Sequence, residues 1–295
     1  MAKILHKEQL SADVYLMRVH APLIVEERKA GQFIILQTDE EFGERIPLTI
    51  ADANEDEGSI TLIFQVVGKT TTELSQFNVG DDLPVLVGPL GRPTHIENFG
   101  KVVCVGGGIG VAPLHPIAQA LKAAGNEVTT IIGARNKDLI ILEKEMKAIA
   151  DNLIICTDDG SYGRKDLVTA PLKELCENEA TKPNMVIAIG PPIMMKFCSL
   201  TTKPYGVFTQ VSLNTIMVDG TGMCGGCRVN VGNHVKFVCV DGPEFDGHLV
   251  DFDNMMARLS SYKGLETEAL HKCNVDKEFE AKLEEKKWVT FHKQR

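Results

Sequence analysis

Short runs of β-branched and aliphatic residues recur along the first part of the chain, with glycines and polar residues between them. Such runs are typical of strands, and they cover residues 14–19, 32–37, 59–67 and 83–87. No helix-length periodic segment interrupts them. Residues 1–97 are therefore predicted to form a small antiparallel β-barrel.

From residue 98 the pattern changes to an alternation of strands and helices. An apolar strand at 101–105 enters a glycine-rich loop, and a helix is expected from about 113 to 124, ending before Gly125. Further strands are expected at 128–133, 153–157 and 185–189, and helices near 142–150 and 167–177. The alternation predicts a doubly wound parallel sheet with helices on both faces over residues 98–210. Its ligand is expected at the carboxyl ends of the strands.

Residues 211–250 break this alternation with a group of possible metal ligands. Asp219, Cys224, Cys227 and Cys239 follow the pattern D-x4-C-x2-C-x11-C, with glycines between the first three. Glycines let the backbone turn so that several ligands converge on one point. Thiolates grouped in this way usually hold zinc or an iron–sulfur cluster. These residues alone leave both alternatives open.

Beyond residue 250 the chain is polar, and two amphipathic helices are expected at 253–263 and 276–288. In the second, Glu278 and Lys282 have the i,i+4 spacing of a helical ion pair. We expect the segment 251–295 to cover other parts of the protein or to contact a partner.

Composition and charge narrow the class of protein. The chain has 295 residues, enough for two or three domains, and a formal net charge of −9, which argues against a nucleic-acid binder. It begins without the apolar core of a signal peptide and contains no apolar run long enough for a membrane span. We therefore expect a cytoplasmic protein whose eight cysteines stay reduced.

Two segments of the predicted barrel suit a cofactor that carries phosphates. In segment 45–49, Arg45 offers a guanidinium for a pyrophosphate. Pro47 stiffens the backbone of the same segment, which can then lie along a flat ring. The turn at 68–72 follows a strand and opens a helix, so its amides and hydroxyls form a phosphate seat. The candidate residues are Arg45, Pro47, Leu48, Thr49, Phe64, Gln65, Val66, Gly68, Thr70 and Thr71.

Three loops at the carboxyl ends of the predicted parallel strands suit a nucleotide. The first resembles a dinucleotide fingerprint but has Val111 where a third glycine is usual. The second loop, at 157–161, carries the carboxylates of Asp158 and Asp159, which would bind a ribose 2′-hydroxyl and repel a 2′-phosphate. NAD(H) is therefore predicted over NADP(H). Arg164 could reverse this preference. The candidates are Gly107, Gly108, Ile109, Gly110, Val111, Ala112, Asp158, Asp159, Gly160, Gly190, Pro191 and Met194.

The order of these motifs resembles the ferredoxin–NADP reductase family, in which FAD binds the barrel and a nicotinamide nucleotide binds the α/β domain. The added cysteine segment resembles that of dihydroorotate dehydrogenase electron-transfer subunits, which have cysteine at all four ligand positions. It is more similar to the small subunits of NADH-dependent ferredoxin:NADP oxidoreductases, also called sulfide dehydrogenase β subunits. The aspartate at position 219 is what distinguishes the two.

The resemblance implies a [2Fe–2S] cluster held by Asp219, Cys224, Cys227 and Cys239, and it favours iron over zinc. It also implies electron transfer from NADH through FAD to this cluster, without a side-chain acid or base, so no catalytic residues are predicted. The implied partner is a larger flavoprotein subunit with FAD and [4Fe–4S] clusters, which couples NAD(H), NADP(H) and ferredoxin by flavin-based bifurcation. The alternatives are the electron-transfer subunit of a dihydroorotate dehydrogenase and a metal-stapled nucleotide-binding regulator without redox activity.

Overall fold

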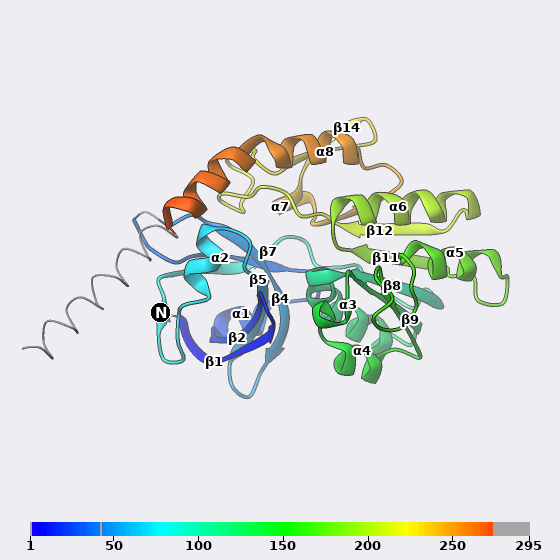
Figure 1. Ribbon diagram of the computed structural model, residues 1–295, viewed down its shortest axis with the longest axis horizontal. Helices are drawn as coiled ribbons and strands as arrows, with labels where there is room; N and C mark the ends of the chain where they lie inside the picture. Colours follow the sequence, from blue (N-terminus) through cyan, green and yellow to red (C-terminus); the bar gives the residue numbers. More distant parts are fainter. Residues whose placement is uncertain (1, 42, 274–295) are drawn as a thin grey trace, which may run out of the picture.

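A computed structural model describes residues 2–41 and 43–273 of the chain. These residues form two large sheets, and the later part of the chain lies across both of them (Figure 1). The expected helix at 276–288 lies outside the described residues. None of the helices in the described ranges is long and apolar enough to cross a membrane.

The first sheet is the predicted antiparallel barrel. Its strands, in the order β6-β1-β2-β5-β4-β3-β7, are all paired antiparallel. They are β1 (Ala2–Ser11), β2 (Val14–His20), β3 (Phe33–Gln37), β4 (Ile46–Asn54), β5 (Ser59–Gln65), β6 (Asp82–Leu83) and β7 (Val85–Leu90). Because β6 and β7 are separated only by Pro84 and pair with opposite edges, segment 82–90 closes the sheet.

Two short helices flank the barrel. Helix α1 (Pro22–Glu27) begins at a proline, whose fixed φ suits the first turn of a helix. Helix α2 (Lys69–Leu74) follows β5 and lies at the phosphate-seat turn that the sequence predicts.

The second sheet is the predicted parallel one, in the order β10-β9-β8-β11-β12-β15. Only β15 runs antiparallel to its neighbour. The strands are β8 (Lys101–Gly107), β9 (Glu127–Ala134), β10 (Asn152–Thr157), β11 (Met185–Ile189), β12 (Phe208–Ser212) and β15 (Glu244–Asp246). The strand order reverses between β8 and β11, so a ligand crevice is expected at the carboxyl ends of these two strands.

Helices cover both faces of this sheet, as predicted (Figure 1). Residues 102 and 104 of β8 pack with α3 (Val111–Ala123) and α4 (Glu143–Ile149), whereas residues 103 and 105 face α5 (Thr169–Glu177) and α6 (Pro192–Thr202). This alternation is the two-residue period of a strand buried on both sides. Helix α6 was not expected, because the sequence predicts a loop over residues 190–195, whereas the helix begins at Pro192, the second proline after Gly190.

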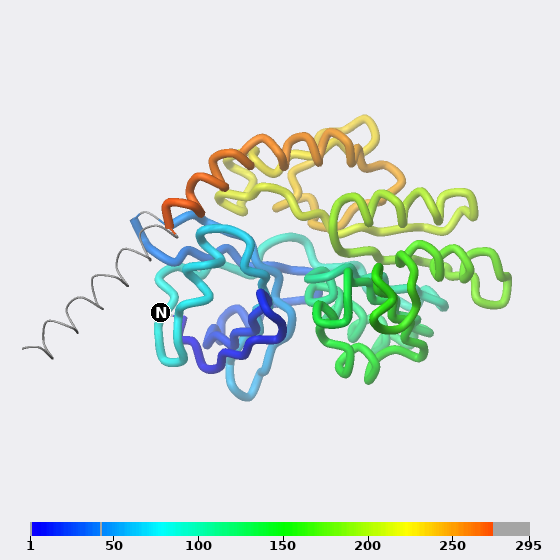
Figure 2. Tube along the Cα trace, viewed as in Figure 1, coloured from blue at the N-terminus to red at the C-terminus, as the bar shows by residue number. Residues whose placement is uncertain are grey.

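The segment after β12 folds back over both sheets. It contains a hairpin of β13 (Arg228–Val231) and β14 (His234–Phe237), then α7 (Val238–Asp241), β15 and α8 (Phe252–Leu259). Helix α8 overlaps the expected helix 253–263 but begins one residue earlier, and the Asp251 side chain caps it by accepting a hydrogen bond from the Asn254 amide. The trace returns over the barrel after α8 (Figure 2).

One hydrophobic core joins the barrel, the parallel sheet and the later segment. It includes Phe33 and Ile35 of β3 together with Val211, Leu213, Val238 and Cys239. The neighbouring β3 residues Ile34 and Leu36 point the other way, into the barrel core. Strand β3 is therefore buried on both faces, and its outer face is where the later segment docks.

Candidate functional site

The loop after β8 packs directly against the loop after β11. A Cβ atom added to Gly107 would overlap the Met194 sulfur and lie 3.2 Å from Pro191 Cδ. One added to Gly190 would lie 2.7 Å from Met194 Cε and 3.1 Å from Gly107 Cα. The structure thus brings these four predicted residues together at the reversal point of the sheet, where only glycine allows such close approach.

The departure from the dinucleotide fingerprint at Val111 has a steric explanation. Val111 is buried at the start of α3, and its Cγ2 atom would lie 2.9 Å from a Cβ atom on Gly106. A Cβ atom on Gly110 would in turn overlap the carbonyl group of Ile189. Close packing of helix against strand, the usual role of the third glycine, is therefore supplied by Gly106 and Gly110.

The remaining residues of this loop offer backbone more than side chains. Gly108 has φ +55° and open space around its Cα atom, and it begins the short turn (Gly108–Gly110) that contains Ile109. Ala112 is buried against the sheet. Because Pro113 has no amide hydrogen, this loop presents to a ligand its glycine backbone before the thirteen-residue helix α3 rather than a full turn of free helical amides.

The loop after β10 is joined to the end of β9. The Asp158 amide donates to the Ala134 carbonyl (3.1 Å), and the Asp159 amide donates to the Arg135 carbonyl (3.2 Å). The Ser161 side chain, and the Ser161 amide that donates to the Asp159 carboxylate at 2.8 Å, hold the pKa of Asp159 below its usual value. Gly160, at φ +77°, completes the turn. Asp158 and Asp159 therefore lie at the same edge of the sheet as the other two loops.

Arg164, the residue that could reverse the NAD(H) preference, is held elsewhere. Its guanidinium donates to both carboxylate oxygens of Glu174 at 2.7 Å and to Asp166 at 2.9 Å. These two carboxylates raise the pKa of the arginine. A guanidinium with two carboxylate partners is poorly placed to attract a 2′-phosphate.

The register of β4 against β3 determines which candidate side chains face the later segment. Pro47 pairs with Ile35 and Thr49 with Phe33, and cross-strand partners point to the same side of a sheet. Leu48 pairs with Ile34 and packs toward the barrel core. Pro47 and Thr49 are therefore on the outer face of the barrel, next to the residues that the later segment covers.

Arg45 precedes β4 and has a buried Nε atom that no hydrogen-bond partner reaches in the described part of the chain. A buried polar atom without a partner costs free energy, on the order of 1–3 kcal/mol. A pyrophosphate beside Pro47 and Thr49 would supply the missing acceptor, so the residues present fit a dinucleotide such as FAD.

The candidate residues around α2 form hydrogen bonds within the protein that the sequence does not predict. The Thr71 hydroxyl accepts from the amides of Val67 and Gly68 (both 3.0 Å), and the Thr70 hydroxyl donates to Glu44 (3.0 Å). What remains for a phosphate is the amide groups of the first helical turn, which have no partner within the helix.

The last three barrel candidates also have internal partners. The Phe64 ring is buried in the barrel core and stacks on Tyr15 at 6.0 Å. Gln65 donates to the Asp13 carboxylate at 2.6 Å, and the Val66 amide donates to the Asp13 carbonyl at 2.7 Å. These contacts fix the end of β5 and thereby the position of α2.

The proposed cluster ligands lie in one loop and one short helix. The sulfur atoms of Cys227 and Cys239 are 3.2 Å apart and buried. Cys224 is exposed, and its sulfur accepts from the Gly226 amide at 3.4 Å. Asp219 lies beside Cys224, whose amide donates to the aspartate at 2.9 Å. The Asp219 carboxylate also accepts from the Thr221 amide at 3.0 Å, which lowers its pKa.

Asp219 therefore organises the loop around Cys224, and each of its oxygens keeps a further lone pair for a metal. In the ranges 2–41 and 43–273, no three His, Cys, Asp or Glu side chains are gathered closely enough to hold a single ion. A tetrahedral zinc site needs four ligands around one point, whereas a binuclear cluster divides its ligands between two irons. The donor set of three thiols and one carboxylate fits a binuclear cluster, which needs four anionic ligands.

The cluster loop docks on the barrel through a glycine. Gly220 has φ +75°, and a Cβ atom there would lie 2.8 Å from both Ile35 Cγ1 and Leu90 Cδ1. Ile35 is the cross-strand partner of Pro47. Neighbouring strands are about 4.8 Å apart, so the cluster loop touches the strand next to the predicted flavin strand.

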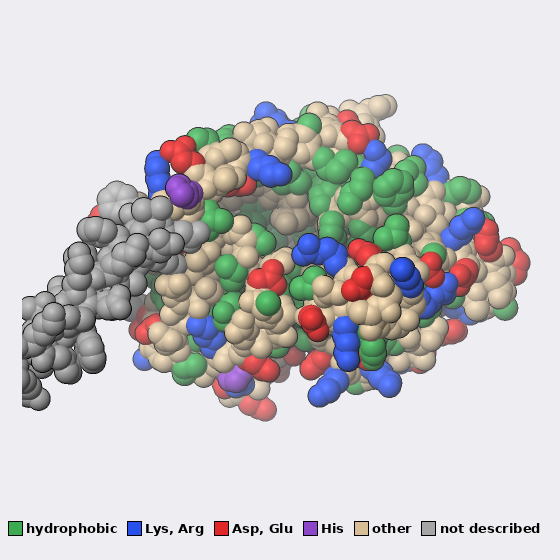
Figure 3. Space-filling model, viewed as in Figure 1, with side chains coloured by type: hydrophobic (Ala, Val, Ile, Leu, Met, Phe, Trp, Pro, Cys, Tyr) green, Lys and Arg blue, Asp and Glu red, His purple; other side chains and the backbone are tan. Residues whose placement is uncertain are grey.

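The molecular surface is consistent with a cofactor site at this junction. In Figure 3 the surface is hollowed between α8 and the barrel, and hydrophobic side chains gather beside the hollow over α6. Helix α3, which starts at the loop after β8, packs against β4, and the cluster loop packs against the neighbouring β3 and β7. An arrangement of this kind can hold a nucleotide, a flavin and a cluster in sequence.

The comparisons with known proteins identify the class. Residues 104–199 match the oxidoreductase NAD-binding domain, and residues 214–251 match the iron–sulfur cluster binding domain of dihydroorotate dehydrogenase B. All four proposed ligands lie within the second match. The chain is therefore an NAD-linked oxidoreductase subunit of the ferredoxin–NADP reductase fold, and the predicted FAD, NAD(H) and iron–sulfur cofactors are confirmed.

The chain belongs to the family of dihydroorotate dehydrogenase B electron-transfer subunits and their homologues. The Thermotoga maritima electron transfer subunit homolog is 50% identical, over 88% of this chain and 91% of that protein. The Desulforamulus reducens electron transfer subunit is 35% identical, over 83% and 95%.

A solved structure also resembles this chain over almost its full length. A chain of the NADH-dependent reduced ferredoxin–NADP oxidoreductase, a structure described for its insights into flavin-based electron bifurcation, is 46% identical to this chain. The two align with a TM-score of 0.87, over 92% of this chain and 97% of that one.

Several structural residues of this region were not predicted from the sequence. Gly106 and Gly220 act through close contacts with residues distant in the chain, and Glu244 joins three segments. Gly106 and Gly220 belong to glycine-rich motifs that the sequence shows, and this is the only sign in the sequence that they make close contacts. Glu244 lies in a Gly-Pro-Glu segment that gives no such signal.

Proposed function

We propose that this chain is the FAD- and [2Fe–2S]-containing small subunit of an NADH-dependent ferredoxin:NADP oxidoreductase that carries out flavin-based electron bifurcation. The observation that carries this proposal is the 46% identity, over almost the full length, to a chain of such an enzyme. It agrees with the aspartate at position 219, where the dihydroorotate-type subunits have cysteine.

The site residues divide the work of holding the cofactors. The loops with Gly107 and Gly190 hold the nicotinamide nucleotide at the carboxyl ends of β8 and β11. Arg45 binds the FAD pyrophosphate, and the outer face of β4 supports the ring. A bound flavin exchanges electron pairs with a nicotinamide and single electrons with an iron–sulfur cluster. The contact between Gly220 and Ile35 keeps the cluster loop against this site.

The partner in this proposal is a larger flavoprotein subunit with a second FAD and [4Fe–4S] clusters, through which ferredoxin reacts. The cluster loop supports a partner contact, because Met223 is 87% exposed and Val218 is 52% exposed beside the exposed Cys224. Exposed apolar side chains grouped around a functional loop are typical of an interaction surface. We further propose a cytoplasmic location, which agrees with eight free cysteines.

The alternative is the electron-transfer subunit of a dihydroorotate dehydrogenase, which the names of the sequence relatives favour. Purification of the native complex through a tag on this chain separates the two. We expect a larger flavoprotein with [4Fe–4S] clusters and NADPH-dependent reduction of ferredoxin and NAD⁺. Recovery of a dihydroorotate-oxidising flavoprotein, with no ferredoxin activity, would establish the alternative.

A further inference from the structure

Glu244, the first residue of β15, joins three segments that are distant in the sequence. Its carboxylate accepts from the Thr94 hydroxyl at 2.7 Å and from the Gln210 side-chain amide at 2.6 Å. Thr94 belongs to the linker between the two sheets, and Gln210 lies on β12. A Cβ atom on Gly31, just before β3, would lie 2.8 Å from the carboxylate. The barrel, the parallel sheet and the cluster segment therefore meet at this side chain.

No cation compensates the Glu244 carboxylate in the part of the chain that the structure describes. The neighbouring elements do carry charged groups, but each is paired elsewhere or exposed. Arg92 pairs with Asp241 at 3.7 Å, Arg28 with Asp52 at 3.8 Å, His95 with Glu97 at 3.1 Å and His248 with Asp246 at 3.7 Å, while Lys29 is exposed. The two neutral donors are thus the hydrogen-bonding partners of this carboxylate.

The same geometry accommodates the protonated carboxyl group. A threonine hydroxyl can accept as well as donate, and a glutamine amide can turn its oxygen toward the carboxyl proton. Burial raises the pKa of Glu244 to about 7, and the bonds from Thr94 and Gln210 lower it by a smaller amount. Both protonation states are therefore accessible near neutral pH.

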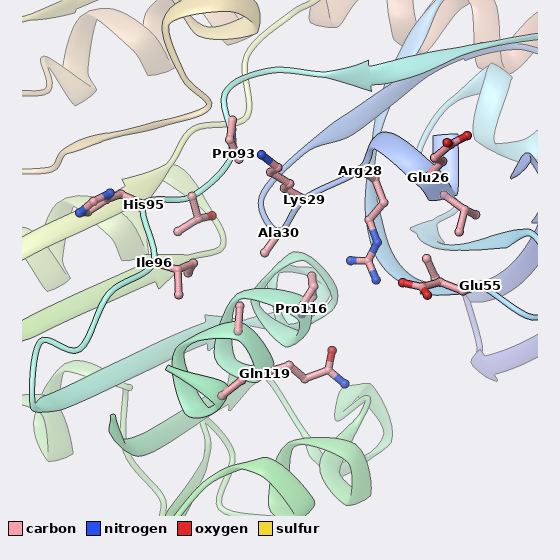
Figure 4. A pocket seen from close by; sticks show the side chains of 15 residues that line it. Glu26, Arg28, Lys29, Ala30, Glu55, Pro93, His95, Ile96, Pro116 and Gln119 are labelled. Carbon is pink, nitrogen blue, oxygen red and sulfur yellow. The ribbon is translucent and has the colours of Figure 1, made fainter. Parts of the chain in front are cut away.

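Solvent reaches this junction through a cleft between the barrel and α3. The cleft has a volume of about 780 Å³, and Thr94 forms part of its wall. Figure 4 shows Arg28 extending from the barrel side and Gln119 from α3. Because the Thr94 hydroxyl binds Glu244, the cleft wall is one side chain away from the buried carboxyl group, and protons can exchange there.

We propose that Glu244 is a pH-responsive latch, which in its neutral form holds the cluster segment to the linker and in its ionised form weakens that junction. A charge without a counter-ion in a desolvated site is unfavourable. The carboxyl group is protonated more readily in the folded chain than in the unfolded chain. Its contribution to stability is therefore full below 4.5, the ordinary pKa of a glutamate, and is lost as the pH rises from there through about 7.

The latch is tested on the full-length, cofactor-loaded protein by its midpoint of thermal unfolding, Tm, between about pH 5 and about pH 9. For the wild type we expect Tm to fall, by on the order of 5 °C, as the pH rises through neutrality. The Glu244→Gln variant resembles the neutral form of the side chain at every pH, so its Tm should not show this fall. Glu55→Gln, on the exposed rim of the same cleft, is the matched control and should follow the wild type.

A second variant and a local measurement keep the test decisive if Glu244→Gln folds poorly. Thr94→Val removes a donor that lowers the pKa of Glu244, so the fall in Tm should move to higher pH. The protection factor of the Arg92 amide, which is its hydrogen-exchange rate relative to the intrinsic base-catalysed rate at each pH, should fall as Glu244 ionises in the wild type but not in Glu244→Gln, because this amide donates to the Gly242 carbonyl. Identical Tm profiles for wild type and Glu244→Gln, or an unmoved transition in Thr94→Val, would overturn the latch. These readouts do not depend on the partner subunit or on the proposed function.

Discussion

Replacement of Gly220 by alanine tests whether the cluster loop is docked on the barrel. Gly220 has φ +75°, and its missing Cβ atom would lie 2.8 Å from carbon atoms of Ile35 and Leu90. Carbon atoms normally stay about 3.5–4.0 Å apart, so the new methyl group must push the loop away from β3 and β7. We expect Gly220→Ala to destabilise the protein and to weaken retention of the cluster.

The magnitude follows from two contributions. An alanine in the left-handed region costs about 1–2 kcal/mol, and forcing a methyl group into a packed contact costs about 1–3 kcal/mol more. The total loss expected for Gly220→Ala is therefore about 2–5 kcal/mol. Chemical denaturation followed by circular dichroism measures it, and the visible absorption of the same samples reports the iron–sulfur cluster.

Gly232→Ala is the matched control. Gly232 lies in the turn between β13 and β14 with φ +56° and has no atom within 4 Å of the added Cβ position. Its loss should be limited to the backbone contribution of about 1–2 kcal/mol, with the cluster retained. If the two variants lose the same stability and the same iron, the loop does not pack on the barrel as the structure shows.

Three further predictions address the nucleotide and flavin sites. Gly110→Ala, whose new methyl group would overlap Ile189, should raise the NADH dissociation constant at least tenfold in isothermal titration. Gly108→Ala places its methyl group in open space and should raise it less. Equal increases in the two variants would contradict the packing of Gly110 against Ile189. Arg45→Met should lower the FAD content of the purified protein, measured by absorbance, because the pyrophosphate loses its guanidinium. Asp158→Ala should reduce the preference for NADH over NADPH in dissociation constants, and an unchanged ratio would exclude Asp158 from ribose recognition.

The alternation of strands and helices was predictable because a parallel sheet buries its strands on both faces. The apolar run 101–105 packs on helices from either side, and its sequence shows this directly. Strand β1 was missed because its exposed and buried positions do not alternate regularly. The sequence does not predict helix α6 because the two prolines after Gly190 favour a loop, whereas Pro192 occupies the first helical turn, where proline is common.

The sequence predicts the motifs of the candidate site but not the orientation or the hydrogen-bond partners of their side chains. Which of Pro47, Leu48 and Thr49 faces outward depends on the pairing of β4 with β3, and no local pattern specifies that register. The engagement of the Thr71 hydroxyl with two amides, and of Asp219 with the cluster loop, is likewise set by the folded backbone. The sequence indicated the chemistry, and tertiary contacts determined its geometry.

In the proposed function, electrons pass from NADH to an iron–sulfur cluster held in this chain. An anaerobic titration of the purified protein with NADH, followed by electron paramagnetic resonance, tests it most directly. We expect bleaching of flavin absorption together with the signal of a reduced [2Fe–2S] cluster, and loss of that signal in Cys227→Ser. Zinc as the bound metal, or flavin bleaching without any iron–sulfur signal, would contradict it.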